Sequence, residues 1–233
     1  MKTRFILTLF LLIGILTSCS LISPASAPTT IPSNTPALEF QHPANDPNAS
    51  ATTNQTPSVA PTAQPLSPQQ TVLDRAFLVV TALKDKDMNA VSQFVDPQSG
   101  LRFSPYANVK SSDQVFSADK VGDLMADPTV YTWGVYDGSG APISLTFTDY
   151  YSKFVYDVDF ANAPQIALNH RLGTGNSIDN SQDFYPNSMI VDFYFPGFDP
   201  QYNGMDWRSL RLVFSQNNGS WYLVGIIHDQ WTI

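Results

Sequence analysis

LRLVFSQNNGSWYLVGIIHDQWTI, residues 210–233, is the stretch that decides the fold. On each side of Asn217-Asn218-Gly219 lies a run of β-branched and aromatic residues, which favour strands. Asn-Gly between two such runs is a strong hairpin signal, because these residues accept the positive φ angles of a tight turn. We therefore predict two antiparallel strands, over residues 207–215 and 220–233.

Further strand patterns precede the hairpin. Residues 189–195 alternate, which predicts Val191, Phe193 and Phe195 on one face and Asp192 and Tyr194 on the other. Residues 130–136 are aromatic and β-branched, and Asp137-Gly138-Ser139-Gly140 is typical of a tight turn into a strand over 143–147. A shorter alternating stretch follows Gly100 at residues 101–103.

Helical spacing of apolar residues predicts a first helix over residues 67–84. Asp87 is placed to cap a second, shorter helix that ends before Pro97. Two more short helices are expected, over 119–126 and over 149–155 with Thr148 as its cap. Helices on one face of a curved, mostly antiparallel sheet make an α+β fold, and residues 69–233 suffice for a single domain.

The N-terminus has the features of an export signal. Lys2 and Arg4 precede an apolar run over residues 5–16, which fits a signal-peptide core and is shorter than the ~20 residues of a membrane span. Leu16-Thr17-Ser18-Cys19 then resembles the lipobox of bacterial lipoproteins. The resemblance implies cleavage after residue 18 and a diacylglyceryl group on the Cys19 thiol, with palmitate-type acyl chains in the membrane.

Two other interpretations of the N-terminus stay open. One is an ordinary secretory signal cleaved at Ala25-Ser26-Ala27, and the other is an uncleaved anchor. All three predict a domain outside the cytoplasm, and the lipoprotein interpretation places it at the bacterial cell envelope, anchored in the membrane by its lipid. Cys19 is the only cysteine, so the domain is expected to fold without disulfides.

Residues 19–68 are predicted to form a disordered linker. Ten of the 18 prolines lie there among Ser, Thr, Ala, Asn and Gln, and apolar residues are too sparse for a core. Removal of Lys2 and Arg4 with the signal peptide leaves 10 basic against 20 acidic residues, a formal charge of −10. The basic residues are scattered, which argues against nucleic acid and anionic lipid headgroups as partners.

Two segments resemble the nuclear-transport-factor-two-like domains, a superfamily of cone-shaped, cystatin-like α+β folds. TALKDKDMNAVSQFVDPQSGLRFSPY (81–106) resembles their opening helix, turn, helix and strand, and the W-x-L-x-x-I pattern at Trp221 resembles their last strand. The segments YTWGVYDGSG and KFVYDVDF are also similar to those of certain bacterial lipoproteins. The resemblance implies the fold, and the superfamily holds both enzymes and pure binding modules.

His228 is the candidate catalytic residue. In a regular strand it shares a face with Tyr222, Val224 and Ile226, while its neighbour Asp229 points away. An aspartate from elsewhere, Asp192 or Asp157, would have to orient the ring for acid–base chemistry in a cavity of a few hundred Å³. His228 sealed in packing would argue against an enzyme.

The sequence gives less support to phosphate binding, to hydrolysis by a serine nucleophile and to metal binding. The loop Gly173-Thr174-Gly175-Asn176 lacks the spacing of a phosphate-binding motif, and no nucleophile elbow occurs. The carboxylate pairs Asp157/Asp159 and Asp179/Asp183 suit calcium, but neither completes a calcium loop. Three scattered histidines do not suit zinc. We expect no metal and no cofactor.

Aromatic residues supply the remaining signal. Most will be core, but Trp133 and Tyr136 lie near Asp137, and Tyr202 and Trp207 near Asp206, as in surfaces that bind a small molecule, glycan or peptide. The sequence therefore predicts a lipid-anchored module that binds a ligand or an envelope protein. A cone-fold enzyme with an Asp–His pair is the alternative, and a purely structural envelope protein is a third interpretation.

Overall fold

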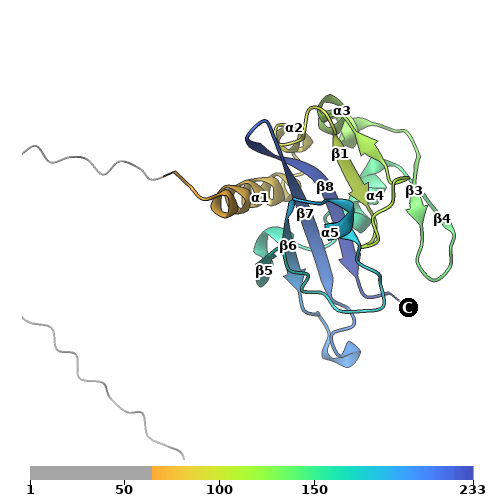
Figure 1. The fold of residues 1–233 in the computed structure, drawn as a ribbon. Helices are drawn as coiled ribbons and strands as arrows, with labels where there is room; N and C mark the ends of the chain where they lie inside the picture. The colour runs from red at the N-terminus through yellow and green to blue at the C-terminus, as the bar shows by residue number, and fades with distance from the viewer. Residues whose placement is uncertain (1–64, 233) are drawn as a thin grey trace, which may run out of the picture. The chain divides into compact units, whose positions relative to one another are not determined.

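The computed structural model describes residues 65–232 (Figure 1). The predicted signal peptide, Cys19 and the predicted linker up to residue 64 lie outside the described residues, so those predictions stay predictions. Within residues 65–232, no helix has both the length and the apolar character needed to cross a membrane.

The C-terminal hairpin forms as predicted. Strands β7 (Arg208–Asn217) and β8 (Ser220–Gln230) pair antiparallel along their whole length. At the turn Asn218 has φ 49° and Gly219 has φ 80°, the left-handed conformation that a two-residue hairpin loop requires.

The hairpin forms the centre of a six-stranded sheet with the order β2-β1-β8-β7-β6-β5. The other strands are β1 (Leu101–Ser104), β2 (Val115–Phe116), β5 (Gln165–Leu168) and β6 (Met189–Phe195). Only β1 and β8 pair parallel, so the sheet is mostly antiparallel, as predicted. A separate hairpin of β3 (Tyr131–Val135) and β4 (Pro142–Leu145) stands beside the β1 end of the sheet (Figure 1).

Two helices begin directly after a residue whose side chain accepts a hydrogen bond from the first turn. Helix α1 (Pro68–Lys84) starts after Ser67, whose Oγ accepts the Gln70 N–H at 3.2 Å. Helix α2 (Met88–Ser92) starts after Asp87, whose carboxylate accepts the Ala90 N–H at 2.9 Å. Shorter helical segments are α3 (Ala118–Asp123), η1 (Leu124–Ala126), η2 (Phe160–Asn162), α5 (Ser181–Phe184) and η3 (Pro200–Tyr202).

Helix α4 (Phe147–Phe154) corrects two predictions. Its cap is Thr146, whose hydroxyl accepts the Asp149 N–H at 3.3 Å, and not Thr148. The strand expected over 143–147 therefore ends at Leu145, because Phe147 already belongs to the helix. Four aromatic residues of α4 are buried: Phe147, Tyr150, Tyr151 and Phe154. Because the helix begins at Phe147, all four rings can face the core.

The sheet is covered on both faces. One face packs on α1 and α4 in the main core, to which Phe103, Phe193 and Leu212 contribute. The opposite face carries a smaller cluster of Val109, Ile190, Val213, Val224 and Ile227, packed against the α5 residue Phe184 and its neighbour Tyr185. The α+β class, with helices packed on a curved and mostly antiparallel sheet, is confirmed.

A bulge in β8 changes which residues share a face. The register shifts between Val213 and Phe214, so Val224 joins the opposite face with Ile227. Ile226 and Leu223 lie on the helical face. The prediction that Val224 and Tyr222 share a face with His228 is therefore wrong, because Leu223 between them points to the helical face, whereas the prediction for Ile226 is confirmed.

Candidate functional site

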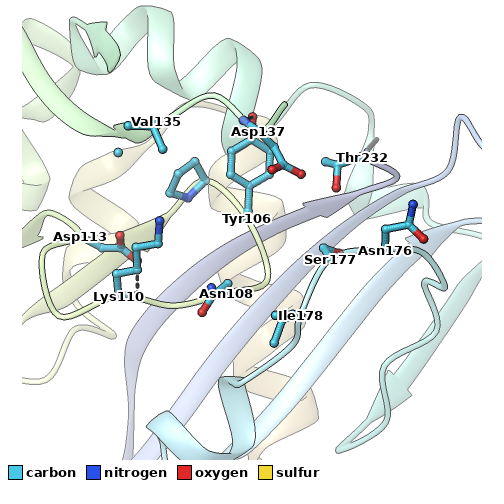
Figure 2. A pocket seen from close by; sticks show the side chains of 12 residues that line it. Tyr106, Asn108, Lys110, Asp113, Val135, Asp137, Asn176, Ser177, Ile178 and Thr232 are labelled. Atoms are coloured by element: carbon cyan, nitrogen blue, oxygen red, sulfur yellow. Dashed lines mark hydrogen bonds between the residues drawn. The ribbon is translucent and has the colours of Figure 1, made fainter. Parts of the chain in front are cut away.

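The candidate site is a cavity of about 270 Å³ bounded by three chain segments. These are the β1–β2 loop (105–113), the β3–β4 hairpin (134–137), and residues 176–178, with Thr232 close by. Figure 2 shows Tyr106, Lys110 and Asp137 on one side and Asn176, Ser177 and Thr232 on the other.

The β1–β2 loop is held by Arg102 and Asp113. Asp113 Oδ2 accepts the Ser104 hydroxyl at 2.6 Å and the Lys110 backbone N–H at 2.9 Å. Arg102 Nη1 donates to the backbone carbonyls of Lys110, Ser111 and Asp113. These bonds satisfy the loop's polar groups from within, so the loop forms a fixed wall of the cavity.

The opposite wall is held by a buried ion pair. Arg171 donates from Nε and Nη2 to the two carboxylate oxygens of Asp229, at 2.7 and 3.0 Å, and from Nη2 to the Ser177 hydroxyl at 2.8 Å. Two-point contact fixes orientation as well as position. The Asn180 amide also bonds the backbone of Val109 through both of its ends, which ties this wall to the β1–β2 loop.

The third wall comes from the β3–β4 hairpin. Gly134 has φ 136°, next to a register shift between Thr132 and Val135, and Val135 and Asp137 line the cavity. The Asp137 backbone N–H donates to the Tyr106 hydroxyl at 3.3 Å, which joins this wall to the β1–β2 loop.

Some charged side chains that line the cavity have partners within the protein, and others do not. Within residues 65–232 neither Lys110 nor Asp137 forms an ion pair, although both line the cavity. Burial raises the pKa of Asp113, and its hydrogen bonds offset this only in part. The cavity thus presents the ammonium of Lys110 and the carboxylate of Asp137, neither of which forms an ion pair with the described residues, although the charge of Lys110 also acts on the nearby Asp113.

Tyr150 lies close to this site from the core side. Its hydroxyl is buried without a hydrogen-bond partner in the described part of the chain. Burial raises the pKa of Tyr150 well above its usual value, and the nearby charge of Asp113 raises it further. Tyr150 therefore stays neutral and contributes packing.

Trp133 and Tyr136 do not form the predicted ligand surface. Trp133 is fully buried and stacks on Tyr150 with ring centroids 3.9 Å apart, and its Nε1 donates to the Leu145 carbonyl at 3.0 Å. Tyr136 packs against Phe154 in the core. The register shift between Thr132 and Val135 explains this correction: Trp133 faces inward, whereas Val135 and Asp137, which regular alternation would place on the same face as Trp133, reach the cavity.

Tyr202 and Trp207, the other two residues predicted to bind a ligand, differ in exposure. Tyr202 is 49% exposed, whereas Trp207 is buried with its Nε1 donating to the Thr174 carbonyl at 2.9 Å. Each lines one of two adjoining depressions that lie apart from the cavity.

His228 pairs with Asp157, one of the two aspartates considered for it. His228 Nε2 lies 3.2 Å from Asp157 Oδ1, and Arg208 Nε donates to Asp157 Oδ2 at 3.0 Å. Burial alone would raise the pKa of Asp157, but His228 and Arg208 outweigh it and lower that pKa. Asp192 lies on the other face and accepts the Ser209 hydroxyl and the Leu172 N–H.

The His228–Asp157 pair does not reach a cavity. The imidazole is fully buried, its ring meets Phe154 edge-on, and none of the five depressions described for the molecule is lined by His228. Asp229 points away to Arg171, as predicted. The geometry is that of a pair sealed in packing, which offers a substrate no approach to the ring.

The carboxylate pairs considered for calcium bind different partners. Asp157 turns to His228 and Arg208, while Asp159 bonds Lys84, Tyr156 and Asn162. The segment is not a strand, so the two do not share a strand face as expected. Asp179 pairs with Arg211. In residues 65–232, no three His, Cys, Asp or Glu side chains gather as a metal site would need.

Sequence reasoning missed Asn108, Lys110 and the segment 176–178. These residues lie in stretches without periodicity, and only the folded chain brings positions about 70 residues apart together. The one available signal was the Gly173–Asn176 loop. Gly173 packs so close to Trp207 that an added Cβ would lie 2.4 Å from the indole ring.

Comparisons with known proteins add little. No protein-family model matches the chain, and no curated protein matches it. Among solved structures, an NTF2-like designed protein, Rd1NTF2_05 with substitutions, is 12% identical with a TM-score of 0.30, covering 70% of this chain and 99% of its own. A putative calcium/calmodulin-dependent protein kinase II association domain from Xanthomonas campestris is 13% identical with a TM-score of 0.28, covering 75% and 93%. Likenesses this weak carry no functional conclusion.

Proposed function

We propose that this protein is a lipid-anchored, extracytoplasmic binding module whose cavity takes a small zwitterionic ligand. One observation carries the ligand class: Lys110 and Asp137 both line the cavity, and neither is in an ion pair within the described part of the chain. A ligand with one carboxylate and one ammonium group would complement both charges.

The size and the remaining lining support a small ligand. A volume of about 270 Å³ lies just below the ~300–1,000 Å³ range of drug-sized ligand sites. Asn108 and Asn176 add amide donors and acceptors, and the Tyr106 ring supplies an apolar surface. A free amino acid or a dipeptide has this size and charge pattern.

The anchor is supported by the N-terminal sequence. The lipobox-like Leu16-Thr17-Ser18-Cys19 follows a signal-peptide core, and a proline-rich stretch separates it from the folded domain. Such a stretch can hold a domain away from the membrane surface. The resemblance of residues 81–106 and 210–233 to nuclear-transport-factor-two-like domains is compatible with this proposal, because that superfamily includes binding modules.

Mass spectrometry of the mature N-terminus tests the anchor. We expect a peptide that begins at Cys19 and carries diacylglyceryl and acyl mass. Cys19→Ser should move the protein from the membrane fraction to the soluble fraction. An unmodified mature peptide that begins after Ala27 would refute the anchor and leave the cavity proposal standing.

Calorimetry with free amino acids and alanyl dipeptides tests the cavity. We expect saturable binding that Lys110→Gln and Asp137→Asn each weaken about tenfold, roughly 1.4 kcal/mol each. Lys153→Gln and Asp183→Asn, at exposed positions outside the cavity, are the matched controls. Absence of binding by every zwitterion, or equal affinity in all four variants, would reject the ligand class.

A further inference from the structure

We propose that a second groove, separate from the cavity, binds a neutral oligosaccharide. We call it the Trp231 groove. It consists of two adjoining depressions of about 320 Å³ each, which share Met205 and Trp231. It lies where the β6–β7 connection meets the last residues of β8.

The groove offers apolar surface to a ligand. Tyr202 is 49% exposed and Met205 is 45% exposed, while Trp231 is partly exposed between the two depressions. Trp207 forms a rigid wall, since its Nε1 is bonded to the Thr174 carbonyl. Aromatic rings that keep an exposed face can pack against the C–H face of a sugar ring, which is apolar although its edge is polar.

Polar groups around the groove remain unpaired. The Gln230 amide, the Trp231 indole N–H and the Tyr202 hydroxyl line the depressions and make no side-chain hydrogen bond with the described residues. An amide and a phenol both donate and accept. A ring hydroxyl does the same, so a sugar can satisfy all three groups at once.

The charges and hydrogen-bonding groups of the groove favour a neutral sugar over an anionic sugar or a proline-rich peptide. The mature chain is strongly acidic, and Arg208, the cation in the groove, is already committed to Asp157 and to two backbone carbonyls. An anionic sugar therefore meets no uncompensated cation there. A proline-rich peptide would bring few N–H donors to the acceptors on Gln230 and Tyr202, because proline has none.

The shape favours a chain of sugars over a single one. The two depressions have Met205 and Trp231 in common, so they adjoin at these side chains and together offer more lining surface than one sugar ring would use. The groove shares no lining residue with the cavity: Thr174 lines the groove, whereas Asn176 and Ser177 line the cavity. This inference therefore stands independently of the zwitterion proposal.

Tryptophan fluorescence and calorimetry on the full chain in detergent test the groove. The probes are the neutral tetramers of N-acetylglucosamine and of glucose, an anionic galacturonate oligomer, and a synthetic peptide of residues 24–64. We expect at least one neutral tetramer to bind saturably and the other two probes to bind at least tenfold more weakly.

Paired variants identify the site. Tyr202→Ala should weaken binding of the neutral tetramer about tenfold through loss of stacking. Phe198→Ala is the matched control, because Phe198 is 53% exposed on the same connection but lies outside both depressions. Trp231→Phe, which keeps a ring and removes the indole N–H, should give a smaller loss than Tyr202→Ala. Unchanged circular dichroism would show that each variant folds.

Three outcomes would overturn the inference. The first is no saturable binding of either neutral tetramer. The second is equal loss in Tyr202→Ala and Phe198→Ala, which would place binding elsewhere. The third is stronger binding of the peptide or of the anionic oligomer, which would make the groove a protein-binding or a charge-driven surface.

Discussion

His228 shows how neighbours decide what a residue does. Its sequence context, a lone histidine beside an aspartate near the end of a strand, allows acid–base chemistry. In the folded chain the ring is enclosed between Phe154 and Asp157, and Arg208 completes the charge balance. The side chain thus joins the end of α4 to β7 and β8, which is a structural task.

Replacement of His228 should therefore cost stability. His228→Ala leaves a cavity and removes a hydrogen-bond partner of Asp157, so we expect the free energy of unfolding to fall by about 2–3 kcal/mol. Urea denaturation measures this loss. The exposed His170→Ala is the control, with an expected change within about 0.5 kcal/mol. Equal effects of the two substitutions would contradict the structural role.

Asp192 should give the protein a characteristic pH dependence. Burial raises the pKa of Asp192 above that of the unfolded chain, near 3.9, although Ser209 and the Leu172 N–H donate to its carboxylate. The folded state then binds the proton more tightly than the unfolded state does. The stability of the protonated form is fully present below the unfolded pKa and is lost as pH rises through the folded pKa.

The variant Asp192→Asn tests whether Asp192 makes the folded protein more stable as pH falls. The amide can keep both hydrogen bonds without a charge, so the stability that Asp192 adds as pH falls from 7 to 4 should be missing from the variant, whose free energy of unfolding should drop relative to that of the wild type over this range. Both proteins share the other carboxylates, including Asp229 with a raised pKa and Asp157 with a lowered pKa, so the difference between the two pH slopes isolates Asp192. Chemical denaturation at several pH values measures it, with the exposed Asp183→Asn as control. Identical slopes for wild type and Asp192→Asn would refute the assignment.

Residues 171–178 form the element that serves both candidate sites. This segment is held to β8 by Arg171 and Asp229, and its glycines lie against Trp207 and Trp231. Thr174 lines the Trp231 groove, and the residues from Asn176 to Ile178 line the cavity. The segment therefore borders both sites.

Gly173→Ala should displace this segment. The new Cβ would lie 2.4 Å from the ring of the buried Trp207, so backbone or ring has to move, at a cost of about 1–3 kcal/mol in the free energy of unfolding. Gly175→Ala meets Trp231 only at 3.4 Å and should change stability by less than about 0.5 kcal/mol. Thermal unfolding, followed by tryptophan fluorescence, compares the stability of the two variants. Equal stability would show that residues 171–178 accommodate the new Cβ without cost, which would contradict the prediction.

Among the elements, several with local signals were predicted correctly, although the cap of α4 was placed at Thr148 instead of Thr146. The predicted cap Asp87 starts α2, and Asn218-Gly219 makes the hairpin turn, because each acts on a backbone a few residues away. The bulge at Val224 and the parallel pairing of β1 with β8 carry no such signal. Both depend on how distant strands meet, and the bulge alone reversed the predicted face of Val224.

For the whole molecule, the buried apolar residues of the described part of the chain run from Val72 to Ile227, and the sequence predicts a removed signal peptide and a linker without a core before them. Burial of apolar area is the main source of stability, so residues 1–64 should contribute little to it. We expect deletion of residues 1–64 to leave the urea midpoint and the slope of unfolding unchanged. A lower midpoint in the truncated protein would mean that the N-terminal part packs on the domain.

What the sequence alone determined is what neighbouring residues control: most strand and helix patterns, the cap of α2, the hairpin turn and the α+β class. Only the tertiary structure decided which side chains meet in the cavity, why Trp133 belongs to the core, and why His228 is sealed. Periodicity and turn chemistry act over a few residues and leave a trace in the sequence. Proximity between Lys110, Asp137 and Asn176 arises from packing across the whole chain, which no local pattern records.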